Sequence, residues 1–193
     1  MTLRLRTFGS VFLSNDGVLL TGPAGQRRLL ALLTVVAAAG EKGISRDKVL
    51  ALLWSEGAPD KSRHALTQAL YHTRKALAGS QIFLNGGDLR INPTVLTSDV
   101  GDFQHALDEG RLSEVADLYT GAFLDGFYLN GDPGFDFWVS SERDRLSRQY
   151  ADTLLALADE AAAAGDTSGE RRWRGKLAEH DPLDGAATAR LMT

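Results

Sequence analysis

Apolar and polar positions at the start of the chain follow the period of short strands. They alternate over residues 3–8, as in a strand with one buried face. Further short strands are predicted over 11–14 and 18–20. Asp16-Gly17 joins these two strands, because this dipeptide tolerates the positive φ angles of a tight hairpin turn. The pattern therefore predicts a small three-stranded sheet.

Helical spacing replaces the strand period after Gly25. The helices predicted in the first half span residues 26–39, 46–53 with Ser45 as N-cap, and 61–78 with Asp60 as N-cap. A second hairpin, over 82–91, turns at Gly86-Gly87. Two helices joined by a loop and followed by a hairpin are typical of a winged helix-turn-helix. A small α+β domain without a ligand fits the same pattern.

The second half shows helical patterns only. Helices are expected over residues 102–108, 113–119, 135–164, 168–180 and 185–192. Apolar residues recur every three or four positions along the longest of them, and we assign them to the core: Trp138, Val139, Leu146, Tyr150, Leu154, Leu157 and Ala161. A ligand groove is the alternative for this stripe. The pairing of helices around Gly165 indicates a helical-repeat array, and a pair begun at Gly185 would leave that array incomplete.

Charge divides the chain into two unequal halves. Residues 1–93 hold 12 Lys and Arg against 6 Asp and Glu, whereas residues 94–193 hold 9 against 19. A basic half joined to an acidic half is typical of a polyanion-binding domain with a separate partner domain. The lack of cysteine excludes disulfides and cysteine-ligated metals. The longest apolar stretch, 29–39, is shorter than the ~18 residues that indicate a membrane span, so we expect a cytoplasmic protein without membrane contact.

The helix predicted over 61–78 carries the strongest functional signal. Its core-facing residues are Leu66, Ala69, Leu70, Thr73 and Leu77. The opposite face presents amide, hydroxyl and basic groups that suit the edges of DNA bases: Arg63, His64, Thr67, Gln68, Tyr71 and Lys75. No acidic residue lies between Lys61 and Ala78, although a solvated helix face ordinarily carries Glu–Lys pairs. This face therefore predicts a helix that reads the major groove.

Further basic residues are candidates for contacts to the DNA backbone. Those assigned to phosphates lie mainly near predicted helix ends: Arg27, Arg28, Arg46, Lys48, Lys61 and Arg74. Gly86, Gly87 and Arg90 would form a wing that reaches a phosphate or the minor groove. Each of these arginines and lysines taken alone is more often a plain surface cation, but together they indicate a surface that grips the backbone.

Signals for catalysis are weak. Residues 22–27 lack the Lys-Ser/Thr that a phosphate-binding loop requires. Glu142 and Asp144 lie among arginines, as in helix-surface ion pairs, and His64 and His72 are two turns apart, too far to chelate one ion unaided. We therefore expect no catalytic residue, no metal ligand and no cofactor. An enzyme with a helical lid would need facing acid and base groups.

Several blocks, in a specific order, resemble the SARP-type transcriptional activators, the antibiotic regulatory protein family. The blocks are residues 3–9 (LRLRTFG), 26–33 (QRRLLALL), 44–54 (ISRDKVLALLW), 63–77 (RHALTQALYHTRKAL), 118–126 (LYTGAFLDG), 137–146 (FWVSSERDRL), Tyr150, 181–183 and 191–192. The resemblance implies an OmpR-like winged helix-turn-helix over 1–97 and a bacterial transcriptional activation domain of TPR-like helices over 98–193. We expect the helical array to be truncated in this chain.

The same resemblance implies partners and a function. It predicts a sequence-specific activator that binds tandem direct repeats in promoter DNA, as a homodimer, and contacts RNA polymerase through the loop Trp54, Ser55, Glu56 and Gly57. Thr73, His72 and Asp88 depart from the family's usual leucine, arginine and wing aromatic. The main alternative is a protein–protein interaction module whose winged helix no longer binds DNA.

Overall fold

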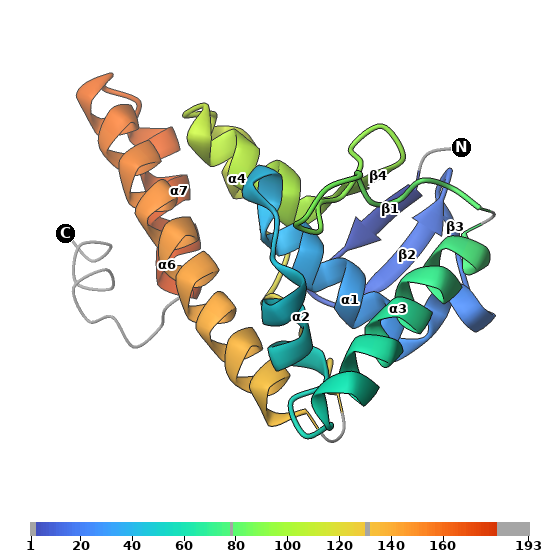
Figure 1. Cartoon of the computed structure of the whole chain (residues 1–193). Helices are drawn as coiled ribbons and strands as arrows, with labels where there is room; N and C mark the ends of the chain where they lie inside the picture. Colours follow the sequence, from blue (N-terminus) through green and yellow to red (C-terminus); the bar gives the residue numbers. More distant parts are fainter. Residues whose placement is uncertain (1–2, 78, 130–131, 181–193) are drawn as a thin grey trace.

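The computed structural model describes residues 3–77, 79–129 and 132–180, and it begins with a small sheet (Figure 1). Its first three strands form two hairpins: β1 (Leu3–Arg6), β2 (Phe12–Asn15) and β3 (Val18–Leu19). Asp16 and Gly17 have φ angles of 48° and 83°. Both angles are positive, so the tight turn predicted from Asp-Gly is confirmed.

A fourth strand, absent from the sequence prediction, completes the sheet. β4 (Leu96–Ser98) runs parallel to β1, with Leu3 opposite Leu96, and the strand order is β3-β2-β1-β4. Residues 97 and 98, where we expected one domain to give way to the next, lie inside β4. The chain therefore passes into its second half within the sheet, without a linker.

Three helices follow β3 in the chain and pack against one another. They are α1 (Arg27–Ala38), α2 (Arg46–Leu53) and α3 (Pro59–Ala76), with short 3-10 helices at Gly22–Gly25 and Gly40–Lys42. The Ser45 side chain accepts a 3.3 Å hydrogen bond from the Lys48 amide, which confirms the predicted cap of α2. The predicted cap of α3 is wrong. This helix begins at Pro59, since proline favours the first helical position, and Asp60 lies in its first turn.

The segment predicted as a second hairpin forms isolated bridges instead of a ladder. Phe83 bridges Ile91, and Leu89 bridges Ile44, which precedes α2. Ile44 and Leu89 exchange two backbone hydrogen bonds of 2.9 and 2.8 Å. These bonds hold the loop 83–89 against the start of α2.

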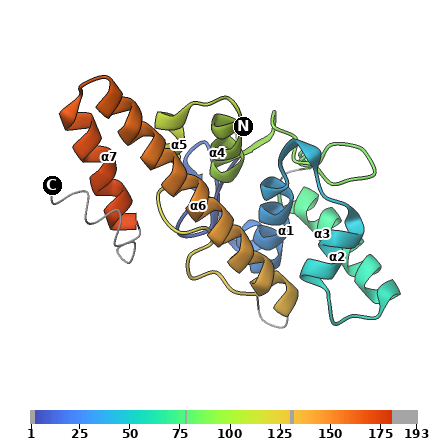
Figure 2. The same ribbon diagram turned by 90° about the vertical axis from the view of Figure 1, so that its left-hand side faces the viewer.

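Within the described residues, the second half contains four helices. They are α4 (Asp99–Asp108), α5 (Leu112–Leu118), α6 (Pro133–Ala163) and α7 (Thr167–His180). Figure 2 shows α6 running from α7 to the neighbourhood of α2. These helices match the four predicted up to residue 180. The helix predicted over 185–192 lies outside the described residues.

One apolar core runs through both halves. The Phe8 ring, which follows β1, lies 5.3 Å from the Phe103 ring of α4, and the rings of Phe123 and Trp138 are 5.9 Å apart. The core faces predicted for α3 and α6 are confirmed: Leu66, Thr73 and Leu77 are buried, as are Leu146 and Leu154. The observed architecture is thus a mixed one, with a small sheet first and a mostly helical second half.

Candidate nucleic-acid interface

The outer face of α3 is exposed, as the sequence predicted. All six candidate base-reading residues are exposed, and 60% of the Tyr71 surface is open to solvent. Thr67 donates a 2.9 Å hydrogen bond from Oγ1 to the Arg63 carbonyl, within the helix. Arg63 also lies 3.4 Å from Asp60, an exposed carboxylate. This face is therefore a row of accessible polar, basic and aromatic groups on a rigid helix.

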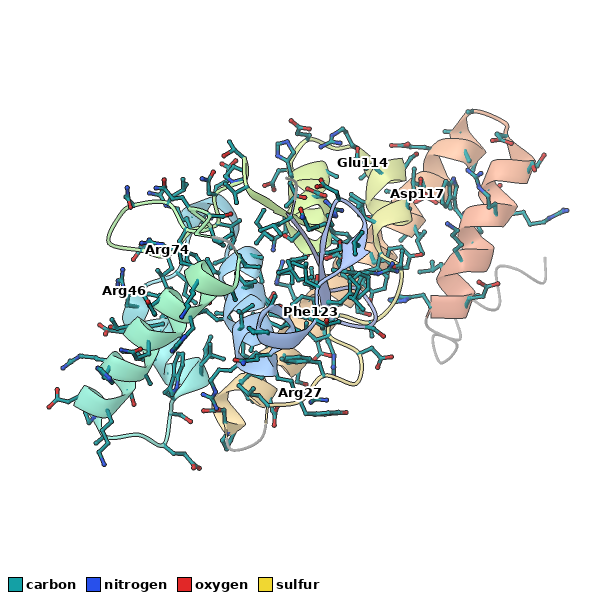
Figure 3. All side chains as sticks on the ribbon, turned by 90° about the vertical axis from the view of Figure 1, so that its right-hand side faces the viewer. Arg27, Arg46, Arg74, Glu114, Asp117 and Phe123 are labelled. Carbon is teal, nitrogen blue, oxygen red and sulfur yellow. The ribbon has the colours of Figure 1, made fainter. Side chains whose placement is uncertain are left out.

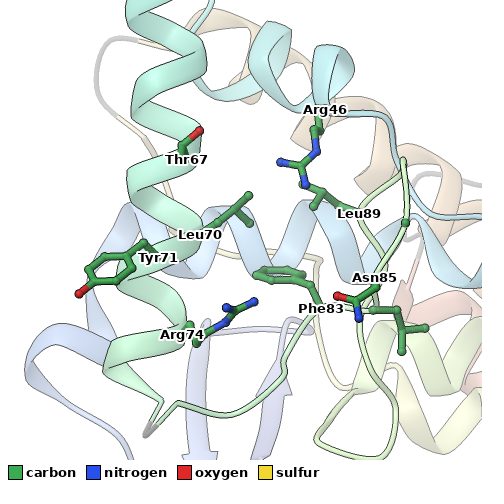
Figure 4. Close-up of a pocket in the computed structure, with 10 residues that line it drawn as sticks. Arg46, Thr67, Leu70, Tyr71, Arg74, Phe83, Asn85 and Leu89 are labelled. Carbon is green, nitrogen blue, oxygen red and sulfur yellow. The ribbon is translucent and has the colours of Figure 1, made fainter.

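A groove separates α3 from the loop 83–89 (Figure 4). Its lining comes from α2, α3 and that loop: Arg46, Thr67, Leu70, Tyr71, Arg74, Phe83, Leu84, Asn85, Gly86 and Leu89. Arg46, from the first turn of α2, and Arg74, from the last turn of α3, extend into it from opposite ends. Neither arginine forms an ion pair with any described residue, and both are exposed. The groove thus combines an apolar floor with two available positive charges.

The three predicted wing residues, Gly86, Gly87 and Arg90, differ in their surroundings. Gly43 has a φ of 72°, and the Arg90 side chain packs directly over it. A Cβ at Gly86 would lie 3.5 Å from a guanidinium nitrogen of Arg90. Arg90 is therefore half-buried behind the groove, whereas Gly86 lines it and Gly87 is exposed at the tip.

Two predicted phosphate contacts lie elsewhere. Arg28 forms a 2.7 Å ion pair with Asp132, donates to the Leu53 carbonyl and stacks over the Trp54 ring at 5.3 Å. Arg27 donates a 2.8 Å hydrogen bond to the Tyr128 carbonyl. The N-terminus of α1 faces the second half of the chain, and these contacts fix it there. We therefore assign Arg28 to the junction and not to the phosphate set, whereas Arg27 lies at the same junction but is exposed.

The remaining predicted residues are accessible. Lys48 and Lys61 are exposed on α2 and α3. In the loop between these helices, Ser55, Glu56 and Gly57 are exposed, and Trp54 is half-buried. The Ser62 hydroxyl donates a 3.2 Å hydrogen bond to the Trp54 carbonyl. The loop is thus anchored at its first residue, Trp54, and its next three residues are exposed to solvent.

No acidic residue is among those that line the groove, although Asp47 follows Arg46 on α2 and Asp88 lies in the loop 83–89, both exposed. Figure 3 places Arg46 and Arg74 toward one end of the molecule, and Glu114 and Asp117 on the second half. Glu114 and Glu109 pair with Arg111 on that half, and the hydrogen bond that Arg111 donates to Glu114 raises the pKa of Arg111. The charge asymmetry of the sequence is therefore a spatial one.

Sequence reasoning missed some polar contacts. In the groove it missed Asn85, whose only signal was its place before Gly86-Gly87. It also missed the contact between Ser147 Oγ and His180 Nε2, 2.8 Å apart. That imidazole packs edge-on against the stacked rings of Tyr119 and Tyr150, at 5.4 and 4.8 Å. We interpret this cluster as packing between α5, α6 and α7.

The described part of the chain shows neither a cluster of metal ligands nor a membrane-spanning helix. Over residues 3–77, 79–129 and 132–180, no three His, Asp or Glu side chains gather as metal ligands would. No helix in the same ranges has the length and apolar character of a membrane span.

The fold is similar to that of a solved protein structure. No protein-family model and no curated protein sequence matches the chain. Mycobacterium tuberculosis EmbR, solved in complex with a low-affinity phosphopeptide, superposes with a TM-score of 0.68 at 19% sequence identity. The match covers 98% of this chain and 53% of the EmbR chain. The chain therefore shares its fold with about half of EmbR.

Proposed function

We propose that this chain is a DNA-binding transcription regulator of the type that its sequence resembles. In this proposal α3 is the recognition helix of a winged helix-turn-helix, the loop 83–89 is the wing, and α4–α7 form two TPR-like pairs. The observation that carries the proposal is the groove beside α3. It places Arg46 and Arg74 at opposite ends of a space bounded by the exposed face of the helix.

The groove suits the phosphate backbone of a duplex. A strand following it would meet two arginines without acidic partners among the described residues, and its bases would face Thr67, Gln68 and Tyr71 on α3. Gln recognises adenine through paired hydrogen bonds, and Thr contacts the thymine methyl group. The likeness to EmbR supports the fold of this arrangement. Promoter activation, tandem direct repeats bound by a homodimer and contact with RNA polymerase are parts of the same proposal.

Selection from a random duplex library tests the proposal with the full chain. We expect enrichment of one motif, bound with a log–log salt slope of about −4 per protomer if ~4–5 phosphates are neutralised. Gln68→Ala should cost about 1–3 kcal/mol on the selected motif and little on random DNA. Lys48→Ala should weaken both about equally. A flat salt response, or no enriched motif, would favour an interaction module that does not bind DNA.

A further inference from the structure

The loop 83–89 is held at both ends, whereas its tip makes no backbone hydrogen bonds. Near the ends, the Leu84 amide donates to the Arg90 carbonyl at 2.9 Å, and Leu89 exchanges two hydrogen bonds with Ile44. Between these bonds, the backbone amides of residues 85–88 donate to no described residue. All four of these residues are exposed, so their amides are accessible to water.

An asparagine and a glycine are neighbours at this tip. The Asn85 carboxamide makes no hydrogen bond to any described residue, and it is exposed on the loop side of the groove (Figure 4). Gly86 has no side chain that would shield its own backbone nitrogen. The side-chain carbonyl carbon of Asn85 and the next backbone nitrogen are therefore both free to react with each other.

The reaction open to this pair is a cyclisation followed by hydrolysis. The Gly86 backbone nitrogen loses its proton to solvent and attacks Asn85 Cγ. A new C–N bond forms, the bond between Cγ and Nδ2 breaks, and Nδ2 takes up a proton and leaves as ammonia. One water molecule then opens the cyclic imide at either carbonyl. The products are an aspartate at position 85 or its isomer linked through the side chain, and no oxidant or reductant is needed.

The other asparagines in the described part of the chain are less suited to this reaction. Asn15 Oδ1 is buried, and the next residue, Asp16, has a side chain. Asn92 precedes Pro93, which has no amide proton to lose. The Asn92 side chain is also held by a 3.0 Å hydrogen bond to the Gln81 carbonyl. A second asparagine–glycine pair, at 130–131, lies outside the described residues.

The product would change the charge of the groove. Asn85 lines the groove together with Arg46 and Arg74, and no acidic residue is among the lining residues. Asp88 belongs to the same loop but is not part of that lining. An aspartate at position 85 is ionised at neutral pH. It would attract the two arginines and repel a phosphate that approaches them.

We propose that Asn85-Gly86 is a site of spontaneous deamidation, and that the resulting carboxylate lowers the affinity of the groove for DNA. The effect on affinity rests on the proposed function, whereas the modification itself does not. The sequence pair supplies the reacting groups, and the fold leaves both of them unbonded beside Arg46 and Arg74. A newly made molecule thus binds DNA more tightly than an aged one, without the action of a second protein.

The test follows the full chain during incubation in mildly alkaline buffer. Peptide mapping by mass spectrometry measures the conversion of Asn85, and titration with duplex DNA measures the affinity of the same samples. Asn85 should convert to aspartate and its isomer, more slowly in mildly acidic buffer because the attacking nitrogen must lose a proton. Asn92 should keep its amide. The DNA affinity should fall in step with the conversion of Asn85.

Two sets of variants control the experiment. Gly86→Ala should slow the conversion and preserve the affinity of aged samples, because a side chain hinders the attack. The fold accommodates it, since the φ of Gly86 is not positive and a Cβ would lie 3.5 Å from the Arg90 guanidinium, an ordinary contact. Freshly made Asn85→Asp should reduce the magnitude of the log–log salt slope of DNA binding by about 1. Asn85→Gln, its neutral counterpart, should leave the slope unchanged.

The two measurements separate the two proposals. An Asn85 amide that persists in the folded wild-type chain, while the urea-unfolded chain loses it, would overturn the modification site. Conversion with unchanged DNA affinity, or an equal loss of affinity in aged Gly86→Ala, would overturn the effect on the groove. Conversion of Asn85 in a chain that binds no DNA even when freshly made would support the modification site and contradict the proposed function.

Discussion

Two pairs of arginines, similar in sequence, have different surroundings in the fold. Arg46 and Arg74 extend into the groove beside α3, exposed and without ion pairs to described residues. Arg27 and Arg28 lie at the junction between the two halves, where they contact Tyr128, Asp132 and backbone carbonyls. A cation without a local acidic partner is available for a polyanion, whereas a cation bonded to carbonyls and a buried carboxylate holds the fold.

Polar groups at the junction therefore stabilise the fold, whereas the arginines in the groove are available to bind a polyanion. Substitutions at the junction should change the free energy of unfolding and leave the DNA affinity of the folded protein nearly unchanged. Substitutions in the groove should do the reverse.

Asp99→Ala should destabilise the protein most. The Asp99 carboxylate is buried and accepts hydrogen bonds from the amides of Thr7, Phe8 and Val100 and from the Thr7 hydroxyl, at 2.6–2.9 Å. It thereby ties the end of β1 to the start of α4. Its removal leaves several buried donors unpaired, and we expect a loss of about 3–5 kcal/mol in the free energy of unfolding, measured in urea.

Asp102→Ala is the matched control on the same helix. Asp102 pairs with Arg4, and both side chains are about 40% exposed, so an exposed ion pair of this kind contributes only about 0–1 kcal/mol. Equal losses for the two variants would show that the burial of Asp99 has no special role in the junction.

Arg28→Ala should be the next most destabilising change. It leaves the buried Asp132 carboxylate without its partner and uncovers Trp54. Because Arg28 itself is 40% exposed, we expect about 2 kcal/mol, below the range for a fully buried pair. Urea unfolding measures this loss, and titration with duplex DNA should show nearly wild-type affinity. A stable variant with weakened DNA binding would return Arg28 to the phosphate set.

The sequence predicted local structure well and long-range contacts poorly. The Asp16-Gly17 turn and the Ser45 cap depend on neighbouring residues, so their patterns sufficed. β4 has three residues, and it becomes a strand only by pairing with β1, more than 90 residues earlier. The partner of Arg28 lies 104 residues away. No pattern near Arg28 distinguishes it from Arg46, since both open a helix.

At the candidate interface, too, local structure could be predicted from the sequence and long-range contacts could not. The exposed face of α3 followed from helical periodicity, because the core-facing residues of this helix recur every three or four positions. The groove did not, since its second wall depends on the two hydrogen bonds between Ile44 and Leu89. These bonds bring Phe83 and Asn85 opposite Leu70 and Arg74.

The double variant Arg46→Ala/Arg74→Ala should show the opposite behaviour to Arg28→Ala. If each arginine contacts one phosphate, the log–log salt slope of DNA binding should decrease in magnitude by about 2. Unfolding in urea should change by less than about 0.5 kcal/mol, because the two side chains are exposed. Arg171→Ala, an exposed arginine on α7, is the control and should leave the slope unchanged. An unchanged slope in the double variant would remove the groove from the DNA interface.

The smallest expected effect concerns tyrosines. Tyr119 and Tyr150 stack on each other between α5, α6 and α7, whereas Tyr71 lines the groove. Burial raises the pKa of Tyr119 and Tyr150 above the usual value of 10.0, and the nearby Tyr119, Glu179 and Asp117 raise that of Tyr150 further. A pKa that is higher in the folded state means that folding favours the neutral phenol. This contribution to stability is complete below about pH 10 and is lost as pH rises from there through the folded-state pKa.

Tyr150→Phe should therefore flatten the alkaline stability profile. Between pH 9 and pH 11 the melting temperature of the wild-type protein should fall more steeply than that of Tyr150→Phe, because the variant keeps only one of the two phenols, that of Tyr119, between α5, α6 and α7. Tyr71→Phe, in the exposed groove, should parallel the wild-type curve. Thermal melts monitored by far-UV circular dichroism at several alkaline pH values measure the difference. If Tyr71→Phe flattens the profile as much as Tyr150→Phe does, burial at the helical junction is not the cause of the alkaline loss of stability.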